Sequence, residues 1–259
     1  MRHRSTNLED SGAKIIANRL RRISGGKALD VATGDGDFIR TLRQTLRDYD
    51  SFVGIDFSKK EIAAARKNPI EAVEFVEMNA ENLKFEDRSF DTVCIANSLH
   101  HLENIGLVLS EMKRTLKPKG HFIVQEMFCD SDQTEAQLSD VLSHNFHADI
   151  DSLLGVPHSR TFTRKEIRKI VGELGLREVE VFESSRYVNC LFCDEWEKCE
   201  DPKNEDMVDY AINEIDENLE RLGKKQDYHK FQVEAERIKS RIRRNGAATA
   251  SILFFIGKK

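Results

Sequence analysis

The stretch from Lys27 to Phe38 constrains the fold of this chain more than any other part of the sequence. An apolar run interrupted by Asp30 ends at two glycines, Gly34 and Gly36, which are separated by one residue. Apolar residues then recur at helical spacing, at positions 38, 39, 42 and 46. This order predicts a strand, a tight turn and a helix, which is how a parallel α/β sheet begins. Glycines at such a turn let a ligand approach the backbone, and the free N–H groups of the helix start point toward it.

The spacing of the two glycines narrows the class of ligand. A nicotinamide or flavin site favours Gly-x-Gly-x-x-Gly, and the third glycine position holds Ile39 here. The pattern from Asp30 to Gly36 is instead acid-x-Ala-x-Gly-x-Gly. It resembles the first motif of class I S-adenosylmethionine (SAM) dependent methyltransferases, with Ala32 in place of the first glycine. The alternative is a tight strand–helix turn in another kind of α/β protein.

Segments behind the turn extend this resemblance in the order and at the spacing of the family. An apolar strand at 51–56 ends in Asp56, and further strands are predicted at 72–76, 89–97 and 121–126. The dipeptide Asn79-Ala80 and the Leu-His-His-Leu segment at 99–102 are also similar to family motifs. The resemblance covers residues 25–130 and is strongest to small-molecule methyltransferases that include quinone-biosynthesis C-methyltransferases.

Together these segments predict a doubly wound, mostly parallel α/β sheet, with βα units repeated five times through Glu126. The family resemblance implies the seven-stranded Rossmann-like methyltransferase fold, with helical insertions and an antiparallel last strand at 250–257. We expect a single domain over residues 1–259 that begins with an N-terminal helical cap at 1–24, containing a helix at 8–23. The SAM-binding core spans 25–130, and strict alternation at 177–183 predicts a half-buried strand.

Two segments extend beyond a minimal domain of this family. Residues 130–160 form a lid-like insertion with a helix expected at 133–147. Residues 184–249 carry two apolar stripes at helical spacing on either side of Gly223, which predicts a helical hairpin before the last strand. The stripes could pack on each other and the sheet, cover the substrate as a lid, or join two copies as a homodimer. An apolar stripe indicates burial without identifying the partner.

The resemblance implies SAM as cofactor and S-adenosylhomocysteine as product. Asp56 would accept hydrogen bonds from the ribose hydroxyls, Asn79 and Ala80 would meet the adenine edge, and Asp30 and Asn97 would contact the methionine part. Asp56 could instead be only a turn residue, and Asp30 only a cap of the glycine turn. The expected cofactor-binding residues are Asp30, Ala32, Thr33, Gly34, Gly36, Asp56, Phe57, Asn79, Ala80 and Asn97.

Methyl transfer from SAM is an in-line displacement, so alignment and exclusion of water are the main tasks. A base is needed only if the acceptor carries a proton that must leave. His100 and His101 are the candidate bases, because they follow the fourth strand and imidazole titrates near neutral pH. The alternative is that one imidazole packs under the helix while the other holds the loop.

Two further groups of residues have metal-binding chemistry. His144, His147 and His158 could bind a metal with Asp149 or Asp151, but no tight ligand motif appears and we expect no metal site. Cys190, Cys193 and Cys199 lack a nearby fourth ligand, so we expect reduced thiols, with binding of a soft substrate such as a metalloid as the alternative.

The composition limits the functional classes. The chain is 39% hydrophobic and 33% charged, with a formal net charge of −5 that argues against a large nucleic-acid footprint. It has no run of about 18 apolar residues, and its basic N-terminus leads into polar residues. We therefore expect a cytoplasmic methyltransferase acting on a small molecule, with no membrane span. An RNA methyltransferase and a non-catalytic SAM-binding regulatory protein are the alternatives.

Overall fold

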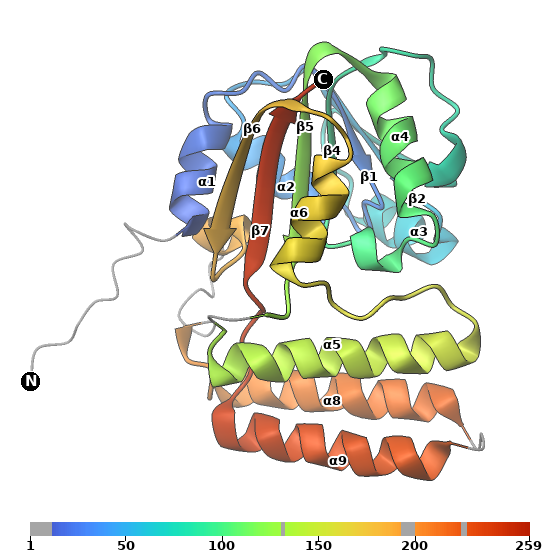
Figure 1. Cartoon of the computed structure of the whole chain (residues 1–259), viewed down its shortest axis with the longest axis vertical. Coiled ribbons are helices and arrows are strands. Elements are labelled where there is room, and N and C mark those ends of the chain that lie inside the picture. Colours follow the sequence, from blue (N-terminus) through green and yellow to red (C-terminus); the bar gives the residue numbers. More distant parts are fainter. Residues whose placement is uncertain (1–11, 131–132, 193–199, 224–226) are drawn as a thin grey trace, which may run out of the picture.

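The computed structural model describes residues 12–130, 133–192, 200–223 and 227–259. Its sheet has seven strands in the order β3-β2-β1-β4-β5-β7-β6, as Figure 1 illustrates. The first five strands are parallel, whereas β7 runs antiparallel to both of its neighbours, which confirms the expected fold class. The strands are β1 Lys27–Val31, β2 Ser51–Asp56, β3 Val73–Glu77, β4 Phe90–Ala96, β5 Leu116–Met127, β6 Arg177–Ser184 and β7 Ile252–Lys258.

Helices cover both faces of the sheet, as the alternating strand and helix patterns predict. One face packs against the apolar sides of α1 (Gly12–Leu20), α2 (Asp37–Thr45) and α3 (Lys59–Lys67). The other face packs against α4 (Ile105–Thr115) and α6 (Arg164–Gly172). The central strands are buried on both sides, which explains their continuous apolar composition.

Two expectations about the sheet are wrong in detail. The units do not repeat as βα five times, because only a short 3₁₀ turn, η2 (Ala80–Asn82), lies between β3 and β4. The strand predicted at 177–183 is confirmed as β6, but its residues do not alternate between buried and exposed. It is the edge strand, its register shifts between Arg177 and Glu180, and Glu178 has a φ of 50°. This irregularity interrupts the two-residue period on which the prediction relied.

The two insertions form one layer rather than two separate elements. Helix α5 (Glu135–Leu154) belongs to the first insertion and extends beyond the expected 133–147. Helices α8 (Glu205–Leu222) and α9 (Tyr228–Asn245) form the expected hairpin, and they pack on α5 around a separate apolar core. In Figure 1 these three helices lie stacked beyond the carboxyl end of β5 and the amino end of β7. The apolar stripes of the hairpin therefore face each other and α5.

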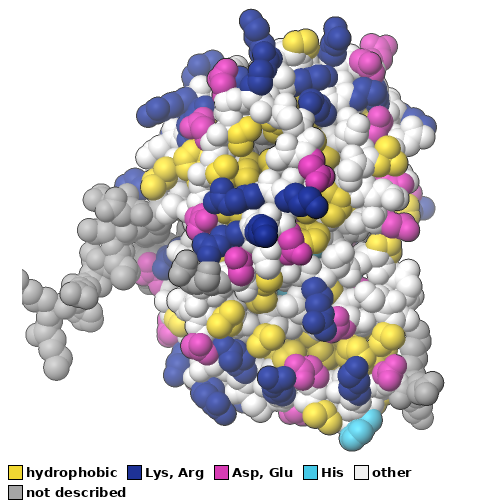
Figure 2. All heavy atoms as spheres, in the orientation of Figure 1, with side chains coloured by type: hydrophobic (Ala, Val, Ile, Leu, Met, Phe, Trp, Pro, Cys, Tyr) yellow, Lys and Arg dark blue, Asp and Glu magenta, His cyan; other side chains and the backbone are white. Residues whose placement is uncertain are grey.

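The surface carries charges of both signs. Figure 2 shows basic and acidic side chains interspersed over the face seen in Figure 1. On α6 and the neighbouring β6, Arg164 and Arg168 both form ion pairs with Glu183, at 3.0 and 3.2 Å. Within the described ranges, no helix is both long and apolar enough to cross a membrane.

Candidate functional site

The turn between β1 and α2 adopts the backbone conformation that its glycines suggest. Gly34 and Gly36 have φ angles of 54° and 91°, a region that side chains with a Cβ rarely adopt. Ala32 also has a positive φ, of 54°, at the position where the family motif has glycine. A Cβ built on Gly36 would lie 2.7 Å from the ring of Phe75, whereas one on Gly34 would have no heavy atom within 4 Å. The absence of a side chain at Gly36 therefore allows Phe75 to pack against the turn, whereas at Gly34 it leaves open space.

A cavity of about 330 Å³ lies beside this turn. It lies at the carboxyl ends of β1 and β4, where ligands bind in open parallel sheets. Five of the residues expected to bind cofactor line it: Asp30, Ala32, Thr33, Gly34 and Asn97. Gln125, Tyr187, Val188 and Asn189 also line it, and sequence reasoning missed them. The last three lie at or beside η4 (Val188–Phe192), far along the chain from the glycine turn and without a recognisable motif.

Asp30 is buried beneath the turn. The Thr33 hydroxyl donates a hydrogen bond of 2.6 Å to its Oδ2, and the Cys94 thiol lies 3.3 Å from its Oδ1. Burial raises the pKa of the Asp30 carboxyl to about 7, because desolvation outweighs these two hydrogen bonds. Asp30 thus both holds the turn, as the alternative interpretation had it, and faces the cavity.

Two amide oxygens at the cavity are buried without a hydrogen-bond partner among the described residues. They are Oδ1 of Asn97, at the end of β4, and Oδ1 of Asn189 in η4. The Asn189 amide group donates to Asp37 on α2 at 2.9 Å, which fixes the orientation of that side chain. A buried acceptor left unpaired costs about 1–3 kcal/mol, so both oxygens are suited to a ligand that donates N–H groups.

Asp56 lies next to the glycine turn, because β1 and β2 are paired in parallel with Val31 opposite Ile55. Its two carboxylate oxygens accept hydrogen bonds from the backbone N–H groups of Gly34, at 3.0 Å, and Ser58, at 2.8 Å. Each oxygen keeps a further lone pair for a ligand hydroxyl. Phe57, the next residue, is 79% exposed.

The residues expected to meet adenine lie in the turn after β3. The side-chain oxygen of Asn79 accepts the N–H of Glu81 at 2.8 Å, so it caps η2, and the NH₂ group is what Asn79 offers a ligand. Gly36, Asp56, Phe57, Asn79 and Ala80 are not in the lining of the cavity itself. The cavity therefore brings together half of the expected cofactor residues.

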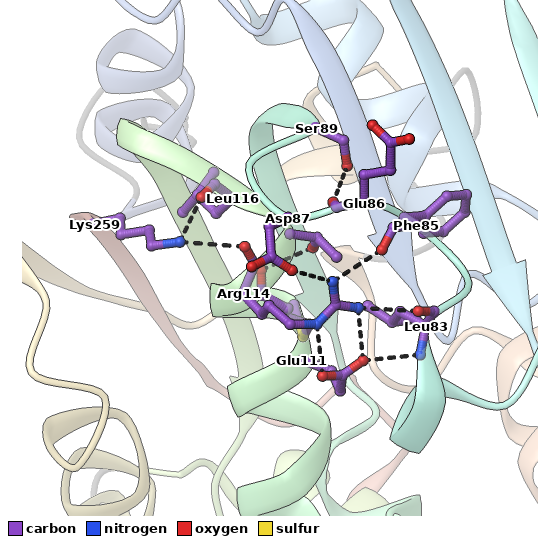
Figure 3. A network of polar contacts seen from close by, with 11 residues as sticks. Leu83, Phe85, Glu86, Asp87, Ser89, Glu111, Arg114, Leu116 and Lys259 are labelled. Carbon is purple, nitrogen blue, oxygen red and sulfur yellow. Dashed lines mark hydrogen bonds and ion pairs between the residues drawn. The ribbon is translucent and has the colours of Figure 1, made fainter.

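Arg114 of α4 holds the segment that follows η2, as Figure 3 shows. Its guanidinium donates to the carbonyl oxygens of Leu83, at 3.0 Å, and Phe85, at 2.9 Å. Glu111 accepts two of its N–H groups, both at 2.8 Å, and also accepts the backbone N–H of Leu83. These hydrogen bonds lower the pKa of the Glu111 carboxyl and fasten the connection between β3 and β4 to α4.

The two candidate bases lie in η3 (Leu99–His101), directly after β4. His100 is buried, and its Nδ1 lies 2.7 Å from the fully buried carboxylate of Glu126. The imidazole of His101 has its ring centre 4.3 Å from that of His100. Desolvation and the neighbouring histidines lower the pKa of His101 to about 3, which makes it a poor proton acceptor at neutral pH.

Other histidines join this pair, although the sequence contains no ligand motif. His144 of α5 and His158 of the following loop lie against His100 and His101, and the ligand atoms of all four lie within 4.8 Å of one another. His147 lies instead beside Asp151 and His158, and Asp149 pairs with Arg160 on the surface. His144 and His158 thus lie against the segment that follows β4, although they come from α5 and the loop after it.

The cysteine pattern can be followed only in part. Cys190 lies half-buried in η4, whereas Cys193 and Cys199 lie outside the described residues. The N-terminal part of the helix expected at 8–23, before Gly12, also lies outside them.

Comparisons with known proteins agree with this geometry. Residues 29–124, which include most of β1 through β5, match the family described as "Methyltransferase domain". This match agrees with the resemblance of the glycine turn and the segments behind it to class I SAM-dependent methyltransferases. Demethylmenaquinone methyltransferase of Thermotoga maritima is 32% identical over 123 residues, which cover 48% of this chain and 53% of that protein. The chain thus matches about half the length of this curated relative.

Solved structures extend the similarity of the methyltransferase domain to the whole fold. Phosphoethanolamine N-methyltransferase 2 of Haemonchus contortus, in complex with S-adenosyl-L-methionine, has a TM-score of 0.55 at 18% identity. That comparison covers 95% of this chain and 52% of the other. The [4+2]-cyclase SpnF has a TM-score of 0.57 at 15% identity, over 95% of this chain and 80% of the other. At this identity the two structures establish the fold alone, and SpnF illustrates that the fold also supports other chemistry.

Proposed function

We propose that this protein transfers a methyl group from SAM to a small-molecule acceptor. The observation that carries the proposal is the cavity at the glycine turn, where Asp30 and the unpaired oxygens of Asn97 and Asn189 meet. A carboxylate and two amide oxygens together suit an ammonium group such as that of an amino acid. The methyltransferase domain over residues 29–124 supports SAM as the molecule that supplies this ammonium.

The residues around the cavity have separate roles in this proposal. Asp56 accepts the ribose hydroxyls with its remaining lone pairs, and the NH₂ group of Asn79 and the backbone of Ala80 meet the adenine edge. Asp30, Asn97 and Asn189 hold the ammonium end. When bound, SAM supplies a methyl carbon already activated by the sulfonium. The protein aligns the acceptor with that carbon and excludes water.

A small acceptor is the class that the surroundings of the cavity favour. The layer of α5, α8 and α9 lies beyond the carboxyl ends of the strands, on the side where the acceptor must enter. The Thermotoga maritima relative is named for a quinone-type substrate, which supports a small molecule over a nucleic acid. On the face seen in Figure 2, basic side chains are interspersed with acidic ones, whereas nucleic-acid sites concentrate positive charge.

Replacement of Asp56 tests the site. Asp56→Ala should weaken binding of SAM and S-adenosylhomocysteine by about 10- to 100-fold in calorimetry, since two charge-assisted hydrogen bonds are lost. Asp209→Ala, an exposed acid on α8, is the matched control and should bind as the wild type does. If the wild-type protein binds neither compound, the proposed function is wrong.

The pH dependence of binding tests the role of Asp30. In the unfolded chain this carboxyl ionises near its usual 3.8, whereas in the folded protein its pKa is about 7. The folded state therefore binds the extra proton between these values, so the contribution of Asp30 to stability falls as the pH rises through this window and is constant above it.

A bound ammonium favours ionised Asp30, so binding must release the proton held below pH 7. We expect the affinity for S-adenosylhomocysteine to rise about tenfold between about pH 5.5 and about pH 7.5. Asp30→Asn should flatten this profile, as measured by calorimetry across the range. An unchanged slope in the variant would assign the pH dependence to another group.

A further inference from the structure

Four imidazoles converge between the sheet and the three-helix layer. His100 and His101 come from η3, His144 from α5, and His158 from the loop between α5 and α6. The Nε2 atoms of His144 and His158 are 3.2 Å apart, and the rings of His101 and His158 have their centres 4.1 Å apart. Four nitrogen ligands around one ion at about 2.0–2.1 Å would lie roughly 3.3 Å from each other. The Nε2 atoms of His144 and His158 already have that separation, and the remaining ligand atoms, all within 4.8 Å of one another, must move closer to bind an ion.

Carboxylates orient two of these imidazoles from behind. Nδ1 of His100 lies 2.7 Å from Glu126, and Nδ1 of His158 lies 2.8 Å from Asp151. The backbone N–H groups of Leu99 and Met127 also donate to Glu126 and fix its position. A carboxylate on one ring nitrogen, with the other nitrogen turned to a shared centre, is the usual arrangement around a metal-binding histidine.

The second ring nitrogen of His100, Nε2, has no hydrogen-bond partner among the described residues. His100 is 1% exposed, and its Nε2 is itself buried. The His100 ring lies against the rings of His101, His144 and His158, with ring centres 4.3, 4.5 and 5.5 Å away. An unpaired buried nitrogen on a ring that lies against three other imidazoles is explained by an ion that all four coordinate.

The charges near the cluster also favour a cation. Glu126 is fully buried and Asp151 is 5% exposed, so two carboxylates lie behind the cluster with little solvent to stabilise them. Arg221 compensates the charge of Asp151, but neutral imidazoles do not compensate that of Glu126, whereas a divalent ion does. Arg221 of α8 donates to Asp151 and also to Nε2 of His147, at 2.8 Å. The guanidinium therefore excludes a cation from the neighbouring group of His147, Asp151 and His158.

We propose that His100, His101, His144 and His158 form a site for a divalent transition-metal ion of the zinc class. All-imidazole coordination suits zinc and its neighbours and disfavours magnesium and calcium, which prefer oxygen. The ion joins η3, which follows the cavity residues Asn97 and Ser98, to the three-helix layer. The N–H of Ser159 donates to the carbonyl of His100 at 2.6 Å and already brings the two parts together. Coordination replaces the general-base role expected for His100 and His101.

Cobalt titration tests the site directly. Untagged protein, stripped with a chelator and dialysed, should bind one equivalent of Co²⁺ and develop the visible absorption bands of nitrogen-coordinated cobalt, which Zn²⁺ abolishes. His144→Ala should weaken binding by about 100-fold or more, because a ligand matters at least as much as its outer-shell partners. His229→Ala, an exposed histidine on α9, is the matched control and should bind as the wild type does.

Two further variants keep the outcome interpretable. Asp151→Asn leaves all four ligands in place and should weaken Co²⁺ binding by about 10- to 100-fold. His101→Ala removes the ligand with the greatest solvent access, so it should fold even if His144→Ala does not, and it should also lose the absorption bands. Equal binding by the wild type and these variants, or no visible bands, would mean a hydrogen-bonded imidazole cluster only and would overturn the site.

The metal site is independent of the proposed function, and S-adenosylhomocysteine calorimetry separates the two. A protein that binds S-adenosylhomocysteine but not Co²⁺ contradicts the metal site and leaves the methyltransferase proposal intact. A protein that binds Co²⁺ but not S-adenosylhomocysteine contradicts the methyltransferase proposal and leaves the metal site intact.

Discussion

Gly34→Ala should bind S-adenosylhomocysteine about 100-fold more weakly than the wild type, a loss of about 2.7 kcal/mol. Gly34 lines the cavity, and a methyl group there meets no protein atom within 4 Å. The added group therefore occupies space beside the cavity that the proposed ligand requires. The fold itself should lose only about 1–2 kcal/mol, the cost of a left-handed conformation at φ 54° for a residue with a Cβ.

Gly36→Ala is the informative contrast. At φ 91° the added Cβ would lie 2.7 Å from a ring atom of Phe75, which packs in the apolar core. This variant should lose stability first, by about 1–3 kcal/mol from overpacking in addition to the backbone strain. Calorimetry for binding and urea titration for stability distinguish the two variants. Wild-type affinity in Gly34→Ala would show that the ligand does not approach the turn.

Ile150→Ala should lower the free energy of unfolding by about 2–5 kcal/mol. Ile150 lies on α5 with no exposed surface, within the apolar core that α5 shares with α8 and α9. Its removal leaves a cavity between the three helices. Because this core is separate from those on the two faces of the sheet, the three-helix layer should loosen before the sheet does.

The matched control is Ile15→Ala on α1, where the side chain is 53% exposed. This change should alter stability by about 0.5 kcal/mol or less. Urea titration followed by circular dichroism measures both variants, and hydrogen exchange identifies which helices open. Equal losses in the two variants would contradict the packing of α5 on the hairpin.

Local patterns predicted the half of the site that lies near the first strands. Strands and helices are identified by the spacing of apolar residues, which is a local property of the sequence. A tight turn is identified by glycines, which can adopt positive φ angles. The sequence alone therefore predicts the turn at Gly34 and Gly36 and the strand end at Asp56, and the structure contains both. Their proximity follows from parallel pairing of consecutive strands, which is itself a general rule of such sheets.

Contacts between distant segments could not be predicted in this way. Tyr187 and Asn189 reach the cavity from a segment without a motif, more than a hundred residues after the turn they face. His144 and His158 meet His100 because α5 lies across the strand ends. An imidazole in a sequence carries no sign of which other imidazole it will face, since ligand groups assembled from separate elements have no fixed spacing.

The sequence by itself thus determined the succession of strands along the chain, the glycine turn and the family that these motifs resemble. Each of these can be read from residues that are near neighbours in the chain. Only the tertiary structure decided that the two insertions form one three-helix layer and that four histidines meet beneath it. The physical reason is that burial of an apolar stripe is a local requirement, whereas the surface that buries it is chosen by the packing of the whole chain.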